Sequence, residues 1–167
     1  IAEYEREKIR ERLLRGRRLK VAAGNVHVHG RPPFGYRLAT ANGKDTLQIN
    51  EEEAAVVRQI YSWYTVGDAQ HGPYSLRAVR RLLNERQIPS PVDRGKPGRK
   101  VQARGAWSVS SVVYILNSET YAGTWRYGKS QTPNYRYHAD AAPDAGLTVP
   151  VPAIVDRQTW ELARAQT

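Results

Sequence analysis

The stretch IAEYEREKIRERLLRGRRLKVAA, residues 1–23, predicts one long helix at the start of the chain. Gly16 is the one residue in it that disfavours a helix, and a glycine costs only about 1 kcal/mol relative to alanine. The apolar residues Ala2, Ile9, Leu13 and Leu14 form a stripe too narrow to bury the helix in a core. We therefore expect a helix that projects from the body of the protein and needs a partner outside it.

The charge of this helix changes sign along its length. Residues 1–8 hold three glutamates against two basic residues, a net charge of −1, whereas residues 9–23 hold six basic residues against one glutamate, a net charge of +5. Residues 75–106 form a second basic segment, with nine basic residues against two acidic ones. The whole chain has a net charge of +10, so these two segments hold more than the entire excess. This clustering favours a polyanionic partner, nucleic acid first and an anionic membrane second.

Composition narrows the class of protein further. A chain of 167 residues that is 40% hydrophobic can form one compact domain with a core. No apolar run approaches the roughly 18 residues of a membrane span, and no signal peptide opens the chain, so we expect no membrane partner and a cytoplasmic protein acting on DNA. The absence of cysteine excludes disulfides and the usual cysteine zinc sites. The chain lacks Met and opens inside a helical pattern, so we expect it to be part of a longer protein.

Three regions are expected: the leading helix (1–23), an extended linker (24–36) and a folded domain (37–167). Consecutive prolines at 32 and 33 keep the linker extended. The residues 36–38 and 46–49 predict a short hairpin, followed by a core helix that begins with a capping-box pattern at Asn50 and Glu53. We expect an α+β fold: a long N-terminal helix, then a mostly helical domain with a helix-turn-helix-like core and a small antiparallel sheet.

Two further helices carry the predicted DNA contacts. Ser75 is expected to cap a helix ending near Arg86, with Asn84 and several arginines on its outer face, and Ser108 to cap a helix ending near Asn117. Small polar side chains on the second of these helices suit insertion into a major groove. Residues 88–106, between these two helices, are predicted to form a basic loop that becomes ordered when it binds DNA. Strands are predicted over 121–129 and 149–155, with a last helix capped by Asp156.

No catalytic site or metal site is predicted. The motifs of nucleotide-binding loops, hydrolase elbows and zinc-protease helices are absent. His27 and His29 lie two residues apart without a third ligand nearby, and the serines at 108, 110 and 111 lack an adjacent base. We expect no cofactor.

Several motifs, in order, resemble the serine recombinases. Glu5-Arg6-Glu7-x-Ile9-x-Glu11-Arg12 resembles the long helix that leaves their catalytic domain, and Gly30-Arg31-Pro32-Pro33-Phe34-Gly35-Tyr36 resembles the linker after it. The later matches are Leu47-x-Ile49, Glu53-Ala54-x-x-Val57-x-x-Ile60-Tyr61, Leu83-Asn84-x-x-x-Ile88-x-Ser90-Pro91, Trp107, Ile115-Leu116-Asn117 and Tyr121-x-Gly123. One departure is Gln87, where the family often has glycine.

The resemblance implies the DNA-binding domain of a large serine recombinase, of the phage integrase or transposon resolvase type. The parent enzyme would form a phosphoseryl-DNA intermediate through a separate N-terminal domain, which would also contact other recombinase subunits, and a zinc domain would commonly follow. The implied partner is a double-stranded DNA attachment half-site, with the first helix and linker along the minor groove. The predicted DNA-binding residues are Arg10, Arg15, Arg17, Arg18, Lys20, Arg31, Arg77, Arg81, Arg99, Lys100, Arg104, Ser108, Ser110, Ser111, Tyr114, Arg126 and Lys129.

Two other functions fit the same composition. One is a stand-alone helix-turn-helix transcriptional regulator, which would have no serine-bearing catalytic domain upstream of Ile1. The other is an RNA-binding or ribosomal protein, which a basic chain also permits. A clear preference for duplex DNA over structured RNA would exclude the second of these.

Overall fold

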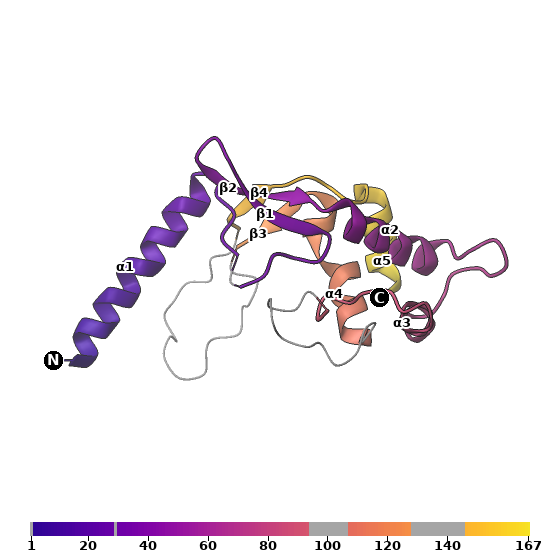
Figure 1. Ribbon diagram of the computed structural model, residues 1–167. Helices are drawn as coiled ribbons and strands as arrows, with labels where there is room; N and C mark the ends of the chain where they lie inside the picture. Colours follow the sequence, from indigo (N-terminus) through magenta and orange to yellow (C-terminus); the bar gives the residue numbers. More distant parts are fainter. Residues whose placement is uncertain (1, 29, 94–106, 128–145) are drawn as a thin grey trace.

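The structure is a computed structural model that describes residues 2–28, 30–93, 107–127 and 146–167 (Figure 1). Its class is α+β, as predicted. The elements are α1 (Ala2–Ala22), β1 (Tyr36–Ala41), β2 (Lys44–Ile49), α2 (Glu51–Thr65), α3 (Leu76–Glu85), α4 (Val109–Asn117), the 3-10 helix η1 (Glu119–Ala122), β3 (Thr124–Arg126), β4 (Thr148–Pro150) and α5 (Arg157–Gln166). The strands form two separate two-stranded antiparallel sheets, β1-β2 and β3-β4, where the sequence predicted one small sheet.

Helix α1 projects from the body and is attached at its C-terminal end (Figure 1). It ends at Ala22, and the φ of +90° at the following Gly24 allows the Gly24 and Asn25 amides to donate to the Val21 and Lys20 carbonyls at 2.8 and 3.0 Å. Val21 and Val26 are each only 2% exposed and anchor this end in the core. Ile9 and Leu13 remain 59% and 56% exposed, which confirms that the narrow apolar stripe does not bury the helix.

The β1-β2 hairpin is longer than the sequence predicted. Its register runs from Tyr36 opposite Ile49 to Ala41 opposite Lys44, so the turn contains only Asn42 and Gly43. Both turn residues have positive φ, 52° and 72°, which is the conformation that an Asn-Gly hairpin turn requires. Lys44 and Asp45, which lie outside the predicted strand residues 46–49, therefore belong to β2.

Helix α2 supplies the centre of the core with buried Ala54, Val57, Ile60 and Tyr61. The predicted capping box at its start is wrong. Asn50 makes no side-chain cap hydrogen bond, and the Glu53 carboxylate accepts the amide of Gly35 at 2.9 Å. Glu53 therefore joins the linker to α2.

The second sheet is shorter than the predicted strands at 121–129, of which 128 and 129 lie outside the described residues, and 149–155. Tyr121 belongs to η1, which ends at Ala122 and is followed by Gly123 with a φ of +92°, and β3 begins only at Thr124. Beyond β4, the Val151 amide donates to the Gly123 carbonyl and the Ile154 amide to the Tyr121 carbonyl, at 3.0 and 2.9 Å. The chain after Pro150 therefore bonds to η1 and its end, and leaves the sheet.

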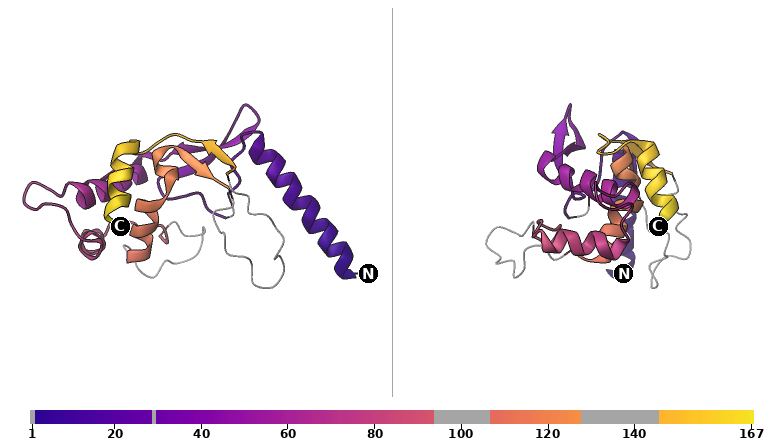
Figure 2. Two further views of the ribbon diagram at one scale, coloured as in Figure 1. Left: turned by 180° about the vertical axis from the view of Figure 1, so that it is seen from behind. Right: turned by 90° about the vertical axis from the view of Figure 1, so that its right-hand side faces the viewer.

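The three remaining helices begin at the predicted capping residues. The side chains of Ser75, Ser108 and Asp156 accept backbone amides three residues later, at 3.3, 3.1 and 2.8 Å. The left view of Figure 2 shows α1 leaving one end of the body while α3 lies toward the other end. Helix α4 packs against both α3 and α5.

Gln87 occupies the left-handed position that follows α3. Its φ is +51°, and the Gln87 and Ile88 amides donate to the Asn84 and Leu83 carbonyls, each at 3.0 Å, as in a glycine-ended helix. Because a left-handed non-glycine residue costs about 1–2 kcal/mol, we expect Gln87→Gly to stabilise the fold by about 0.5–1 kcal/mol after the added chain entropy of glycine. Urea unfolding measures this difference. Gln87→Ala is the control, and a stabilisation equal to that of Gln87→Gly would contradict the prediction.

Candidate nucleic-acid interface

The first candidate surface is the basic half of α1, here called the α1 arm: Arg10, Arg15, Arg17, Arg18 and Lys20. Arg17 is half-buried and the other four side chains are exposed. Within the part of the chain that the structure describes, the side chains of Arg10, Arg15, Arg17 and Lys20 make no ion pair or hydrogen bond. Their positive charge is therefore not neutralised by neighbouring carboxylates.

The face of α1 that carries Arg10 and Arg17 is also its apolar face. A shallow hollow there is lined by Arg6, Ile9, Arg10, Leu13, Leu14 and Arg17. Cations that border exposed leucines combine two kinds of contact, one with an anion and one with an apolar surface. This face of α1 can therefore contact an anionic partner through its arginines and an apolar partner through its apolar side chains.

The linker between α1 and the body has one end fixed in the core. Phe34 and Tyr36 are 6% and 1% exposed, whereas the predicted contact Arg31 is exposed. The Tyr36 hydroxyl donates to the carbonyl oxygens of Thr120 and Pro152, each at 2.8 Å, and burial raises its pKa so that it stays protonated. The anchored end therefore fixes where Arg31 leaves the body.

The second candidate surface lies on α3 and α4. Ser110 and Tyr114 are exposed and four residues apart, so they share one face of α4. Ser108 and Ser111 are placed differently, because the Ser108 hydroxyl caps the Ser111 amide and lies 2.8 Å from the Ser111 hydroxyl. Those two hydroxyls close the first turn of the helix.

The two predicted contacts on α3 differ in their surroundings. Arg77 is exposed, and its side chain makes no hydrogen bond, ion pair or ring contact with the described residues. Arg81 is also exposed, but its Nε lies 3.7 Å from a carboxylate oxygen of Glu85, one turn further along α3. An exposed pair at this spacing is worth only about 0.3–0.5 kcal/mol, so it leaves Arg81 able to exchange partners.

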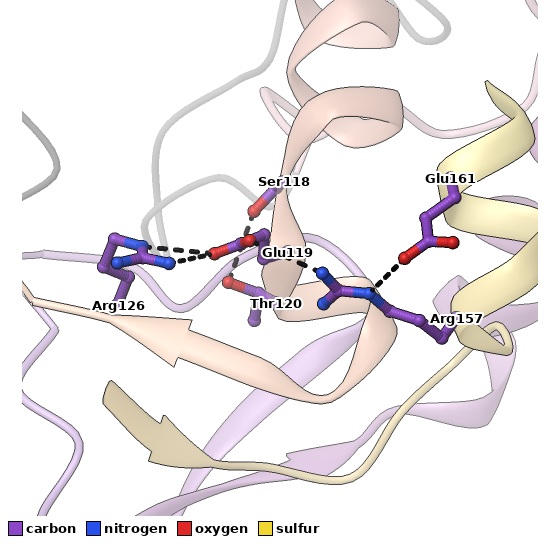
Figure 3. Close-up of polar contacts among 6 residues, drawn as sticks. All are labelled: Ser118, Glu119, Thr120, Arg126, Arg157 and Glu161. Carbon is purple, nitrogen blue, oxygen red and sulfur yellow. Dashed lines mark hydrogen bonds and ion pairs between the residues drawn. The ribbon is translucent and has the colours of Figure 1, made fainter. Parts of the chain in front are cut away.

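Arg126 is held by a carboxylate that the sequence gave no reason to single out. Its Nε and Nη2 both donate to Glu119 Oε2, at 3.1 and 2.8 Å (Figure 3). Arg157 Nη2 lies 3.9 Å from the other Glu119 oxygen and Arg157 Nε donates to Glu161 at 3.0 Å. Glu119, with a side chain 21% exposed, thus joins the end of β3 to the start of α5 and fixes the direction of Arg126.

A hollow beside the C-terminal half of α4 brings several of these groups together. It is lined by Val113, Tyr114, Asn117, Ser118, Glu119, Arg126 and Arg164. Tyr114 and Arg126, both predicted contacts, line this same hollow. Asn117 and Arg164 line the same hollow but are not among the predicted contacts, and Arg164 comes from α5, where it also lies 5.2 Å from the Trp160 ring. No spacing in the sequence links residue 164 to α4.

Four predicted contacts, Arg99, Lys100, Arg104 and Lys129, lie outside the described residues, as does His29. Among the residues that are described, no group of three or more histidine, aspartate or glutamate side chains is placed to hold a metal ion. No described helix has the length and apolar character needed to cross a membrane.

Comparisons with known proteins agree on one class. The family described as Recombinase matches residues 51–167. A curated relative from Bacillus subtilis (strain 168), described as a putative DNA recombinase, is 29% identical over 98% of this chain, which spans 32% of that protein's length.

Two solved structures share the fold. One is described as the crystal structure of an LSR-DNA complex, with a TM-score of 0.52 and 20% identity over 92% of this chain and 36% of that chain. The other concerns the sequence requirements of the Listeria innocua prophage attP site, with a TM-score of 0.54 and 19% identity over 92% of this chain and 50% of that chain.

Proposed function

This chain belongs to the Recombinase family, and we propose that it binds double-stranded DNA at an attachment half-site as the recognition part of a site-specific serine recombinase. The family membership agrees with the resemblance drawn from the sequence motifs. The chain spans about a third of its curated relative, so strand cleavage and rejoining are proposed for the whole protein and not for these residues.

The observation that carries the proposal is the α1 arm: helix α1 projects from the body (Figure 1), and the side chains of Arg10, Arg15, Arg17 and Lys20 have no acidic partner among the described residues. Duplex DNA presents one negative charge per about 1.7 Å of its axis, and a cation that replaces a condensed counterion gains affinity by releasing it. A projecting basic helix can follow such a polymer over several phosphates. A compact anion would engage only one or two of these side chains.

Helix α4 is the proposed source of sequence preference. Its exposed Ser110 and Tyr114 can reach base edges, and a surface of short side chains lets a helix enter a major groove closely. Arg126, fixed by Glu119 beside the same helix, and Arg77 on α3 are proposed to contact the flanking phosphates.

Footprinting of the protein on candidate attachment half-sites tests the proposal, with random duplex and structured RNA as competitors. We expect protection of one half-site and weaker competition by random duplex than by the half-site itself. Equal competition by structured RNA would contradict the proposal and favour an RNA-binding protein.

Tyr114→Ala is expected to reduce the preference for the half-site over random duplex by about tenfold, because a lost base contact is worth about 1–3 kcal/mol. Affinity for random duplex should change little, since the phosphate contacts remain. Ser110→Ala should act in the same direction with a smaller effect.

Fluorescence anisotropy on the two duplexes measures both quantities. Tyr4→Ala is the matched control, since Tyr4 is an exposed tyrosine, 61% against 52% for Tyr114, on the acidic end of α1. A loss that is equal on both duplexes would rule out Tyr114 as a reader of sequence.

A further inference from the structure

Trp107 stands where three segments of the chain meet. It is 3% exposed and immediately precedes Ser108, the residue that caps α4. The Phe34 ring of the linker packs edge-on against its indole, with centroids 5.3 Å apart at 87°. The indole N–H donates to the Ile88 carbonyl, just beyond α3, at 2.9 Å. The start of α4 is thereby tied to the linker and to the end of α3.

Asn84 completes this junction with a paired contact. Its Oδ1 accepts the Trp107 amide at 2.9 Å and its Nδ2 donates to the Trp107 carbonyl at 3.2 Å. The sequence placed Asn84 on the outer face of its helix, and the structure shows it half-buried against Trp107. A carboxamide is the side-chain group that offers one acceptor and one donor in this arrangement without a charge.

The pair fixes both backbone groups of the residue before the α4 cap. These groups lie in a largely buried setting, where a polar atom without a partner is costly. Any tilt or shift of α4 relative to α3 has to break the Asn84 pair or move the Trp107 ring away from Phe34. Helix α4 is therefore held by side-chain contacts at its first turn, close to the exposed Ser110.

We propose that Asn84 is a positioning residue that orients α4 on DNA and, through Trp107 and Phe34, couples this orientation to the linker that leads to the α1 arm. This inference rests on the proposed function. Asn84 itself touches no base or phosphate in this scheme. Its effect is to keep the exposed face of α4, which is proposed to contact base edges, in a fixed position relative to the linker and the α1 arm, which are proposed to contact the DNA phosphates.

The test compares Asn84→Ala, Asn84→Gln and wild type on the half-site and on random duplex. Asn84→Ala is expected to reduce the preference for the half-site by about tenfold, the effect of one poorly read base pair, while affinity for random duplex stays within about twofold. Asn84→Gln keeps the carboxamide and should retain more of the preference than Asn84→Ala. If Asn84→Ala is poorly folded, the preference of Asn84→Gln is compared with that of wild type at a lower temperature.

Tyr64→Phe is the control for a purely structural role, because it removes a hydrogen bond of 2.7 Å from Tyr64 to the Gln166 carbonyl, between α2 and the end of α5. It should lower the melting temperature without changing the preference. An equal change in preference for Tyr64→Phe and Asn84→Ala would overturn the inference. Wild type without any preference for the half-site would overturn the proposed function as well, whereas wild type with a preference that Asn84→Ala retains would overturn the inference alone.

Discussion

Gly35→Ala is expected to destabilise the protein by about 3 kcal/mol. A Cβ at this position would lie 2.7 Å from Ile154 Cδ1 and 3.2 Å from Val57 Cγ2. The φ of Gly35 is also +92°, which adds about 1–2 kcal/mol for a residue with a side chain. Overpacking of a core adds typically 1–3 kcal/mol, so both penalties fall on one substitution.

Gly30→Ala separates the two penalties. Gly30 has a similar φ of +83°, but a Cβ there would meet no atom within 4 Å among the described residues, so only the backbone cost should appear. Urea unfolding monitored by the fluorescence of the buried tryptophans measures both variants. If Gly35→Ala is at least as stable as Gly30→Ala, Ile154 and Val57 move aside without an energetic cost. The close packing of the linker against the core would then contribute nothing to stability.

The sequence predicted the helices well because their signals are local. Ser75, Ser108 and Asp156 each stand three residues before the amide that they cap, and this spacing is visible in the sequence. The apolar residues of α2 likewise recur at the spacing of a single helix, which is visible in the sequence. The projecting helix was predictable for the same reason, since its narrow stripe and its charge gradient belong to a single continuous element.

The sequence could not predict the contacts that join distant segments. Glu53 was assigned to a capping box, yet it accepts the Gly35 amide, 18 residues earlier. Asn84 was assigned to an outer face, yet it pairs with Trp107, 23 residues later. In both cases the local pattern permits two partners, and the tertiary fold decides between them by bringing a buried backbone group within reach.

The extent of the second sheet was predicted wrongly for a related reason. Alternation at 121–129 is typical of a strand, but Tyr121 is required in the core, where it is fully buried and its ring lies 5.9 Å from that of Tyr36. The 3-10 turn of η1 places it there and leaves only three residues for β3. The candidate site shows the same division, since the α1 arm is a local charge pattern whereas the Glu119–Arg126 pair and the hollow with Arg164 depend on the fold.

Arg15→Ala with Arg17→Ala is expected to weaken binding to every duplex, by about 10- to 100-fold at 0.1 M salt. Each phosphate contact that is lost removes about 0.9 from the slope of log affinity against log salt, so the slope should become shallower by about 2. The ratio of the affinities for half-site and random duplex should stay nearly constant, because these side chains are proposed to contact the phosphate backbone of DNA. Stability should also change little, since neither side chain makes an ion pair or a hydrogen bond with the described residues.

The matched control is Arg6→Ala with Lys8→Ala, which removes the same charge from the same helix. Both cations lie in the half of α1 that also carries Glu3, Glu5 and Glu7, where the net charge repels a phosphate backbone. If the α1 arm is the contact, this variant should bind within about twofold to threefold of wild type, because long-range charge alone is screened over about 10 Å at this salt. An equal loss in both double variants would mean that total charge, and not the position of the arm, governs affinity.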